Sequence, residues 1–289
     1  TEMKVKNSFV QESFVWNGHS NDDFRDAAKH LNEIVTYLHD LDEPIYGQDN
    51  LYFQEILQDT PIYSFYERPE EDPFNDEKQL VLLSLQGMFY QEGNEKFNEE
   101  IGLQFYTVEH PGGELVRQAA DLDQYLAQRR DILAYCLTCQ EFSSFMKTCF
   151  PDIIFSDDIE RGLRSIPDFS KLDVRTAIVH DLGVLNDEAL NLYREYYPDT
   201  RKMCQALGSK VLACSIDTPE HNKQLYFSFS YMDNTKSSQI KSVLCSPHTK
   251  LIRRDSDLRI YFAWQDADIG GGEKILVGRI GGHPYSKKR

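Results

Sequence analysis

The sequence predicts an α+β protein in which a helix-rich, acidic N-terminal region precedes a C-terminal domain of mostly antiparallel strands. Two patterns support this. Apolar residues recur at helical spacing near the N-terminus, whereas five short runs rich in β-branched and aromatic residues follow residue 210. A polar segment at 151–175, broken by glycine and proline, separates the two patterns. We therefore expect two domains, residues 1–165 (mainly helical, with short strands) and residues 166–289.

The N-terminal region begins with an amphipathic helix that Asn21 or Asp22 can cap. Its expected buried face comprises Phe24, Ala27, Ala28, Leu31, Ile34, Val35 and Leu38. Four prolines divide residues 42–75 into short strands or loops. The apolar runs at 80–85 and 103–108 fit strands or buried helical turns, and residues 114–150 fit a helix that Pro151 ends.

In the C-terminal region we expect a helix from Asn186 to Tyr197, a shorter one at 201–207, and then five strands in an antiparallel meander. The strand-like runs are 211–216, 224–231, 240–245, 258–264 and 274–280, and the glycine-rich segment 268–272 is the turn between the last two.

Composition excludes several functional classes. There is no apolar run long enough for a membrane span and no signal-like start, so we expect a cytoplasmic protein without membrane contact. The chain contains neither Gly-Lys-Ser/Thr after a glycine-rich loop nor a Gly-x-Gly-x-x-Gly motif, so we expect no cofactor. Cys136 and Cys139 have the spacing of a zinc or redox pair, but Cys149 is the only further thiol nearby, so packed thiols and no metal are favoured.

Charge is distributed unevenly along the chain. The whole sequence has a net charge of −16, yet residues 241–289 contain ten Lys or Arg against five Asp or Glu. A basic site on an acidic body can bind RNA or another nucleic acid while the body repels non-specific polyanion binding. The acidic N-terminal region could instead bind a protein partner or cover the basic face.

Strand periodicity predicts which C-terminal side chains share a face. His248 and Lys250 point the same way, as do Arg259 and Tyr261, and the last strand ends just before His283. Such a set suits metal-independent RNA cleavage, which needs a base, an acid and cations that neutralise charge on the phosphorane. We assign His248 and His283 as base and acid and Lys250 and Arg259 as cations. Candidate substrate-binding residues are Arg253, Arg254, Tyr261, Arg279 and Tyr285.

The final two strands resemble those of RelE/ParE-type toxins, which belong to a wider ribonuclease fold that includes barnase-like and uridylate-specific endoribonucleases. The resemblance covers about 40 residues and is carried by Leu258-Arg-Ile-Tyr-Phe262, a hairpin, and Ile275-Leu-Val-Gly-Arg-Ile-Gly281 followed by a cationic residue. It implies phosphate binding by Arg259 and proton donation by His283. A similar ending in bacterial proteins connected with phage defence implies a toxin-like, antiviral role.

Three interpretations of this cluster remain open at the sequence level. The arginines could be cross-strand salt-bridge partners with no further role. The cluster could be the active site of a ribonuclease or toxin-like effector. It could also be the basic face of a non-catalytic module that binds nucleic acid or protein.

Overall fold

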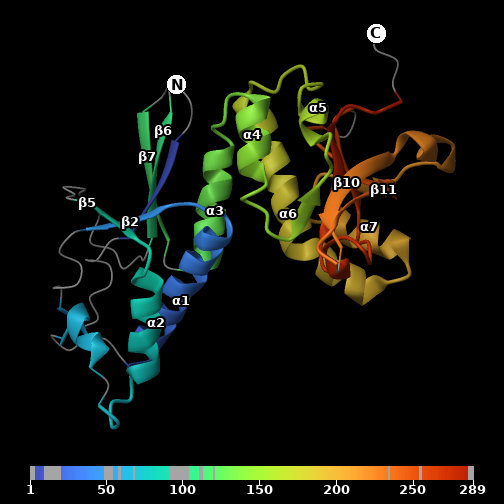
Figure 1. Cartoon of the computed structure of the whole chain (residues 1–289). Coiled ribbons are helices and arrows are strands. Elements are labelled where there is room, and N and C mark those ends of the chain that lie inside the picture. Colours follow the sequence, from blue (N-terminus) through green and yellow to red (C-terminus); the bar gives the residue numbers. More distant parts are fainter. Residues whose placement is uncertain are drawn as a thin grey trace. The chain divides into compact units, whose positions relative to one another are not determined.

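The computed structural model describes residues 4–9, 21–48, 55–57, 60–67, 69–91, 104–110, 113–119, 121–233, 235–253 and 256–285. The chain is of the α+β class, with strands concentrated toward the C-terminus (Figure 1). It divides into two compact units, Thr1–Arg129 and Arg130–Arg289. The expected boundary lies between residues 165 and 166, in the polar segment 151–175, whereas this division falls within a helix at Arg129. Among the described helices, none combines the length and hydropathy needed to cross a membrane.

The first unit contains a five-stranded sheet in the order β5-β2-β1-β6-β7. Strand β1 pairs in parallel with β2 and antiparallel with β6, and β6 and β7 form an antiparallel pair. The strands are β1 (Lys4–Phe9), β2 (Ile45–Gln48), β5 (Phe89–Gln91), β6 (Gln104–His110) and β7 (Gly113–Ala119). A small second pair comprises β3 (Glu55–Leu57) and β4 (Thr60–Pro61), followed by the 3-10 helix η3 (Ile62–Tyr66).

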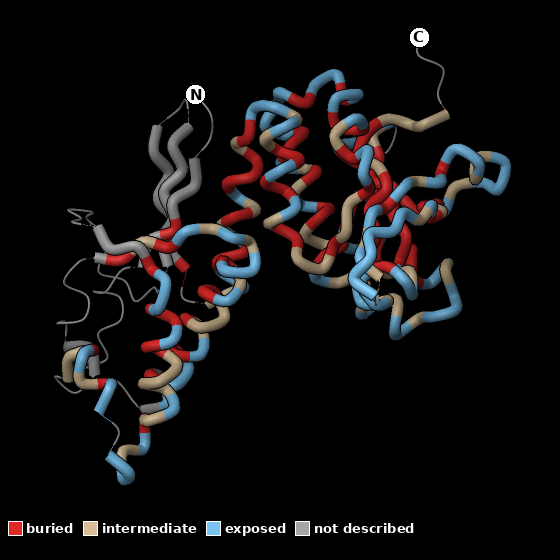
Figure 2. The backbone as a smooth tube through the Cα atoms, in the orientation of Figure 1, coloured by how far each residue is buried: buried red, intermediate tan, exposed pale blue. Residues whose placement is uncertain are grey.

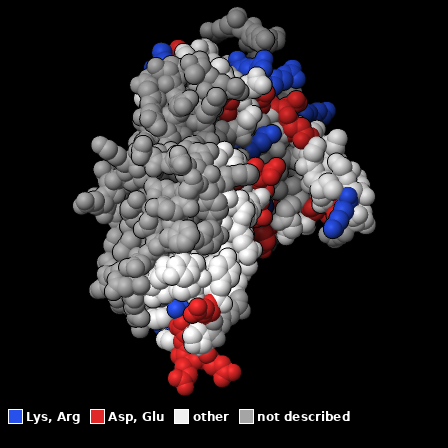
Figure 3. All heavy atoms as spheres, turned by 60° about the vertical axis from the view of Figure 1, so that its left-hand side comes forward, with Lys and Arg blue, Asp and Glu red and all other residues white. Residues whose placement is uncertain are grey.

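Helix α1 (Asn21–Asp40) matches the amphipathic helix that the sequence predicts. All seven apolar side chains of the expected face are buried. Helix α2 (Asn75–Leu85) packs beside α1, and the 80–85 run is therefore helical. Acidic side chains gather at the foot of the view in Figure 3, where the turn before α2 exposes Glu67, Glu70 and Glu71.

A buried ion pair anchors the part of helix α3 (Leu122–Leu133) that belongs to the first unit. The guanidinium of Arg129 is fully buried and donates two hydrogen bonds to the Glu43 carboxylate, at 2.6 and 2.8 Å. Arg129 also donates to the hydroxyl of Tyr125, which in turn donates to the side chain of Asn7. A buried charge is stable only when it is paired, so this cluster fixes α3 against the strand and the loop that carry its partners.

The second unit contains a five-stranded sheet in the order β8-β14-β13-β12-β9. Strand β8 pairs in parallel with β14, and the other pairs are antiparallel. The strands are β8 (Ile153–Phe155), β9 (Cys214–Ile216), β12 (Pro247–Lys250), β13 (Arg259–Ala263) and β14 (Ile275–Gly281). Because β8 belongs to this sheet, the segment around 150–165 is part of the C-terminal unit.

Helices and a hairpin pack against this sheet. The helices of the unit are α4 (Cys139–Met146), α5 (Ile159–Leu163), α6 (Leu172–Tyr196) and α7 (Thr200–Gly208). The hairpin consists of β10 (Tyr226–Met232) and β11 (Ser238–Leu244). Phe229 of the hairpin, Tyr261 and Ala263 of β13 and Leu276 of β14 share one buried cluster. Figure 2 shows buried backbone in the sheet and exposed residues on the outer side of the hairpin.

Three sequence predictions are wrong in their details. Residues 113–119 form β7, so the helix expected over 114–150 starts later. It is also split in two, because Thr138 begins α4 with a capping box that Glu141 completes. The helix expected from Asn186 begins at Leu172, and the Asn186 side chain instead accepts from the backbone N–H of Asp152 at 2.8 Å. The five expected strands do not form one meander, because β10 and β11 leave the sheet as a separate pair.

Candidate functional site

The register of β12, β13 and β14 brings the predicted residues into two adjacent rows. His248 lies opposite Tyr261, which lies opposite Arg279. Lys250 lies opposite Arg259 in the neighbouring row. Directly opposite residues share a face of the sheet, so the face-sharing predicted from strand periodicity is confirmed for β12 and β13. This is the face that the hairpin covers.

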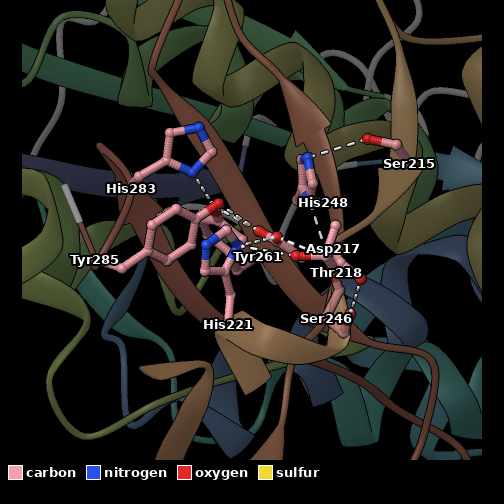
Figure 4. Close-up of polar contacts among 9 residues, drawn as sticks. All are labelled: Ser215, Asp217, Thr218, His221, Ser246, His248, Tyr261, His283 and Tyr285. Atoms are coloured by element: carbon pink, nitrogen blue, oxygen red, sulfur yellow. Dashed lines mark hydrogen bonds and ion pairs between the residues drawn. The ribbon is translucent and has the colours of Figure 1, made fainter. Parts of the chain in front are cut away.

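The two predicted histidines converge on Tyr261. The ring centroids of His248 and His283 are 6.4 Å apart, and those of His248 and Tyr261 are 5.0 Å apart. The Tyr261 hydroxyl lies 2.5 Å from Nδ1 of His283 (Figure 4). The positive φ of Gly281 and its close approach to α5 bend the chain just before His283. An added Cβ at Gly281 would lie 2.6 Å from the Gly162 carbonyl oxygen, so this bend requires glycine.

Two further residues, Asp217 and His221, complete the cluster and were not predicted as site residues. Nδ1 of His221 donates to Oδ1 of Asp217 at 2.8 Å, and the hydroxyl of Tyr285 donates to Oδ2 at 2.7 Å. The His221 and Tyr285 rings stack with centroids 3.7 Å apart. In Figure 4 the Tyr285 ring lies between His283 and His221. The Tyr261 hydroxyl, 3.4 Å from Oδ2, connects this carboxylate to His283.

Local chain geometry explains how Asp217 and His221 meet. The backbone N–H of Asp217 donates to the carbonyl of Ser246, the residue before β12, so the residue directly after β9 is held beside that strand. Thr218 and Pro219 then start the 3-10 helix η4 (Pro219–Gln224). This helix brings the side chain of His221, four residues after Asp217, back over Asp217. The Asp-Thr-Pro-Glu-His spacing at 217–221 is the sequence signal that could have revealed this pair.

His248 is a buried, neutral member of the cluster. It is 5% exposed, and Nε2 accepts from the Ser215 hydroxyl at 3.0 Å while Nδ1 donates to the Ser246 carbonyl at 3.3 Å. Burial lowers the pKa of His248 to about 4, and the positive charge of Arg259 acts in the same direction. Both ring nitrogens are therefore occupied inside the protein.

The other ionisable groups of the cluster also have shifted pKa values. Burial, followed by the charge of Arg259, lowers the pKa of His283 below its usual 6.5. Burial disfavours the Asp217 carboxylate, but hydrogen bonds from His221 and Tyr285 outweigh it and lower the pKa of Asp217. Burial and the Asp217 charge raise the pKa of Tyr285 to about 12, and burial raises that of Tyr261 further. At neutral pH the cluster thus holds two protonated tyrosines, one carboxylate and a neutral His283.

A pocket of about 920 Å³ opens beside His283. His283, Arg279 and Gly282 form one side, Arg161, Arg164 and Ser165 come from α5 and the turn after it, and Tyr226 and Phe227 come from the hairpin. Two carboxylates, Asp158 and Asp257, also line it. Arg161 and Arg164 are not among the predicted site residues, because they lie in the polar segment 151–175, whose pattern is typical of a domain boundary.

The remaining predicted residues have different environments. Arg259 is 6% exposed and donates to the backbone carbonyls of Ser256 and Leu258. No carboxylate among the residues that the structure describes pairs with its guanidinium. Lys250 is partly buried and Arg253 is exposed, and neither residue lines the pocket. Arg254 lies outside the described residues.

Over the described part of the chain, no group of three His, Cys, Asp or Glu side chains is arranged to hold a metal ion. Cys136 and Cys149 are buried free thiols, and burial raises the pKa of Cys136 to about 12. Comparison with protein-family models, curated proteins and solved structures finds no match to this chain.

Proposed function

We propose that the C-terminal unit cleaves RNA phosphodiester bonds without a metal ion, with His283 as the proton-transfer group that faces the substrate. One observation carries the proposal. His283 lines a pocket whose other charged walls include three arginines, and its Nδ1 is in hydrogen-bond contact with a tyrosine that is itself connected to a carboxylate. A positioned imidazole beside cationic groups is the set that phosphodiester cleavage needs.

The hydrogen-bond chain selects the tautomer of His283. We assign the Tyr261 hydroxyl proton to Oδ2 of Asp217, which can only accept, so that the tyrosine oxygen accepts from Nδ1–H of His283. Nε2 then carries a lone pair and serves as a general base. Because the pKa of His283 is lowered, this nitrogen is free of a proton at neutral pH.

The reaction is an internal transesterification. Nε2 of His283 takes the proton of the ribose 2′-hydroxyl, the 2′-oxygen forms a bond to phosphorus, and the bond from phosphorus to the 5′-oxygen breaks. The products are a 2′,3′-cyclic phosphate and a 5′-hydroxyl. The leaving 5′-oxygen takes a proton from a water molecule in the open pocket, and the proton that His283 has taken neutralises the hydroxide so formed. Arg279 neutralises charge on the phosphorane, and Arg259 acts on His283 through its field.

His248 takes a positioning role in this scheme. Its ring lies near that of His283, but Ser215 and Ser246 occupy both of its nitrogens. It packs against Tyr261 and so orients the hydroxyl that holds His283. We expect His248→Ala to lower the rate by disturbing Tyr261.

The test is cleavage of end-labelled single-stranded RNA in EDTA by the parent protein, by His283→Gln and by a control variant, His30→Gln. His30 is a partly exposed histidine of the first unit and is paired with Glu33. We expect cleavage by the parent and the control only, and none of a fully 2′-deoxy strand. Intact RNA with the parent protein, or equal cleavage by His283→Gln, would overturn the proposal.

The second candidate is a non-catalytic module that binds RNA through the same pocket, and the three lining arginines favour it. It predicts RNA retention that weakens steeply with salt and no cleavage. A toxin-like, antiviral role in the cytoplasm, which the resemblance to RelE/ParE-type strands implies, belongs to the catalytic proposal. Expression of the parent chain should then slow bacterial growth, and His283→Gln should not. The acidic N-terminal unit remains the proposed surface for a protein partner.

A further inference from the structure

We propose that Arg161 and Arg164 form a second phosphate-binding subsite next to His283, and that the exposed ring of Tyr226 stacks on a base of the bound strand. This inference rests on the proposed function and names its substrate class. The substrate is a single-stranded polynucleotide that presents at least two consecutive phosphates, one at His283 and Arg279 and the next at α5.

The first observation is the position of the two arginines. Arg161 and Arg164 lie three residues apart in α5 and the turn after it, so they share one side of the helical turn. Helix α5 packs tightly on β14, because a Cβ at Gly162 would lie 2.6 Å from the Ile280 carbonyl oxygen. The side chain of Arg279 passes the same glycine, with its Cγ 3.4 Å from that Cβ position. The helix therefore holds Arg161 and Arg164 beside the strand that leads to His283.

The second observation is that two of the three lining arginines form no ion pair with the described residues. Arg279 donates to the Gly282 carbonyl at 2.9 Å and to the Ser165 hydroxyl at 3.2 Å, and both acceptors are neutral. Neither Arg279 nor Arg161 forms an ion pair with any residue described by the structure. Burial lowers the pKa of Arg279, and the like charge of Arg161 lowers it further. Only Arg164 is paired, with Glu160. Two like charges in one pocket are stabilised when an anion binds between them.

The third observation is the aromatic wall opposite α5. Tyr226 is 53% exposed although it is a large ring, and Phe227 beside it also lines the pocket. An exposed aromatic ring near arginines is the usual platform for a base in single-stranded recognition, since bases in a duplex are stacked on one another. The two lining carboxylates, Asp158 and Asp257, are acceptors that suit the amino groups of a base.

The pocket is large enough to hold more than a single phosphate group. Its volume of about 920 Å³ lies at the upper end of the range for sites that take one small molecule, roughly 300–1,000 Å³.

The test measures binding separately from cleavage. The probe is a fluorescent 2′-O-methyl oligonucleotide, which lacks the attacking hydroxyl, and its affinity is measured by anisotropy at several salt concentrations. We expect Arg161→Gln with Arg164→Gln to reduce the slope of log affinity against log salt by about 1.4, or about 0.7 for each arginine contact. Tyr226→Ala should weaken binding about 5- to 150-fold and leave the slope unchanged.

Arg201→Gln is the matched control, because Arg201 is an exposed arginine of α7 outside the pocket. A single-stranded trinucleotide, with two bridging phosphates, should bind more tightly than a dinucleotide, with one. Absence of binding by the parent protein, unchanged binding by the arginine and tyrosine variants, or equal affinity for a duplex would overturn the subsite. Tight binding with the expected losses, but no cleavage of unmodified RNA, would leave the subsite standing and overturn only the catalytic proposal.

Discussion

Replacement of Gly278 by alanine is predicted to deform the pocket from within the sheet. Gly278 lies on β14 at the point where the register with β13 shifts, and its missing side chain leaves room for the hairpin. An added Cβ would lie 2.3 Å from Cδ2 of Phe227 and 2.8 Å from Sγ of Cys245. Carbon atoms in contact are normally about 3.5–4.0 Å apart, so the Phe227 ring must move by at least about 1.2 Å.

The structure offers little room for that movement. Phe227 packs against the buried cluster beneath the hairpin, and Cys245 within that cluster is fully buried. Overpacking of this kind costs about 1–3 kcal/mol. For a chain of this size, that corresponds to a melting temperature lower by about 2–12 °C. Because Phe227 and Gly278 both line the pocket, oligonucleotide binding should weaken as well.

Gly282→Ala is the matched control for this prediction. Gly282 also lines the pocket, but a Cβ there would meet nothing within 4 Å, and its φ lies outside the left-handed region. Differential scanning calorimetry and anisotropy titrations on both variants measure the two effects. A melting temperature and affinity for Gly278→Ala equal to those of the parent would refute the reasoning, as would equal losses in the two variants.

The remaining predictions concern charge. Glu43→Gln leaves Arg129 buried without its carboxylate and should destabilise the first unit by about 3–5 kcal/mol at pH 7 in urea unfolding. Hydrogen bonds from Arg129 outweigh burial and lower the pKa of Glu43, so the parent should lose this stability only as the pH falls below about 4.5. A difference between parent and variant that does not change with pH would contradict the reasoning. Burial raises the pKa of Asp181, so the charged form of this side chain opposes folding above that pKa. Asp181→Asn should therefore be no less stable than the parent at pH 7 in thermal unfolding. Any gain in melting temperature over the parent should vanish toward pH 3.9. In pH–rate profiles, the acid limb of kcat/KM should lie below pH 6.5, because the pKa of His283 is lowered. Arg259→Met removes a positive charge that lowers this pKa, so the acid limb should move to higher pH. A movement to lower pH would count against His283 as the base.

Local sequence patterns predicted much of the framework of the second unit. Alternation predicted that His248 and Lys250 share a face, as do Arg259 and Tyr261, and the glycines at the end of β14 pointed to His283 as the residue released beside them. These inferences held because they depend on the two-residue period of neighbouring strands that are connected in sequence order.

The parts that could not be predicted depend on pairing across longer stretches of chain. Asp217 follows β9, which pairs with β12 only because an intervening hairpin leaves the sheet. Arg161 lies near His283 because the three-residue strand β8 returns to pair with β14, and so short a strand has no detectable period. Helix α6 starts at Leu172 without a side-chain cap, so no local signal marks its beginning.

The most direct test of the account is the chemistry of the RNA ends. Single-stranded RNA is incubated with the parent protein in EDTA, and the products are identified by mass spectrometry. Transfer of the 2′-hydroxyl proton to His283 predicts fragments that end in a 2′,3′-cyclic phosphate and begin with a 5′-hydroxyl, and none of these with His283→Gln. Intact RNA, or fragments with a 3′-hydroxyl and a 5′-phosphate, would contradict it.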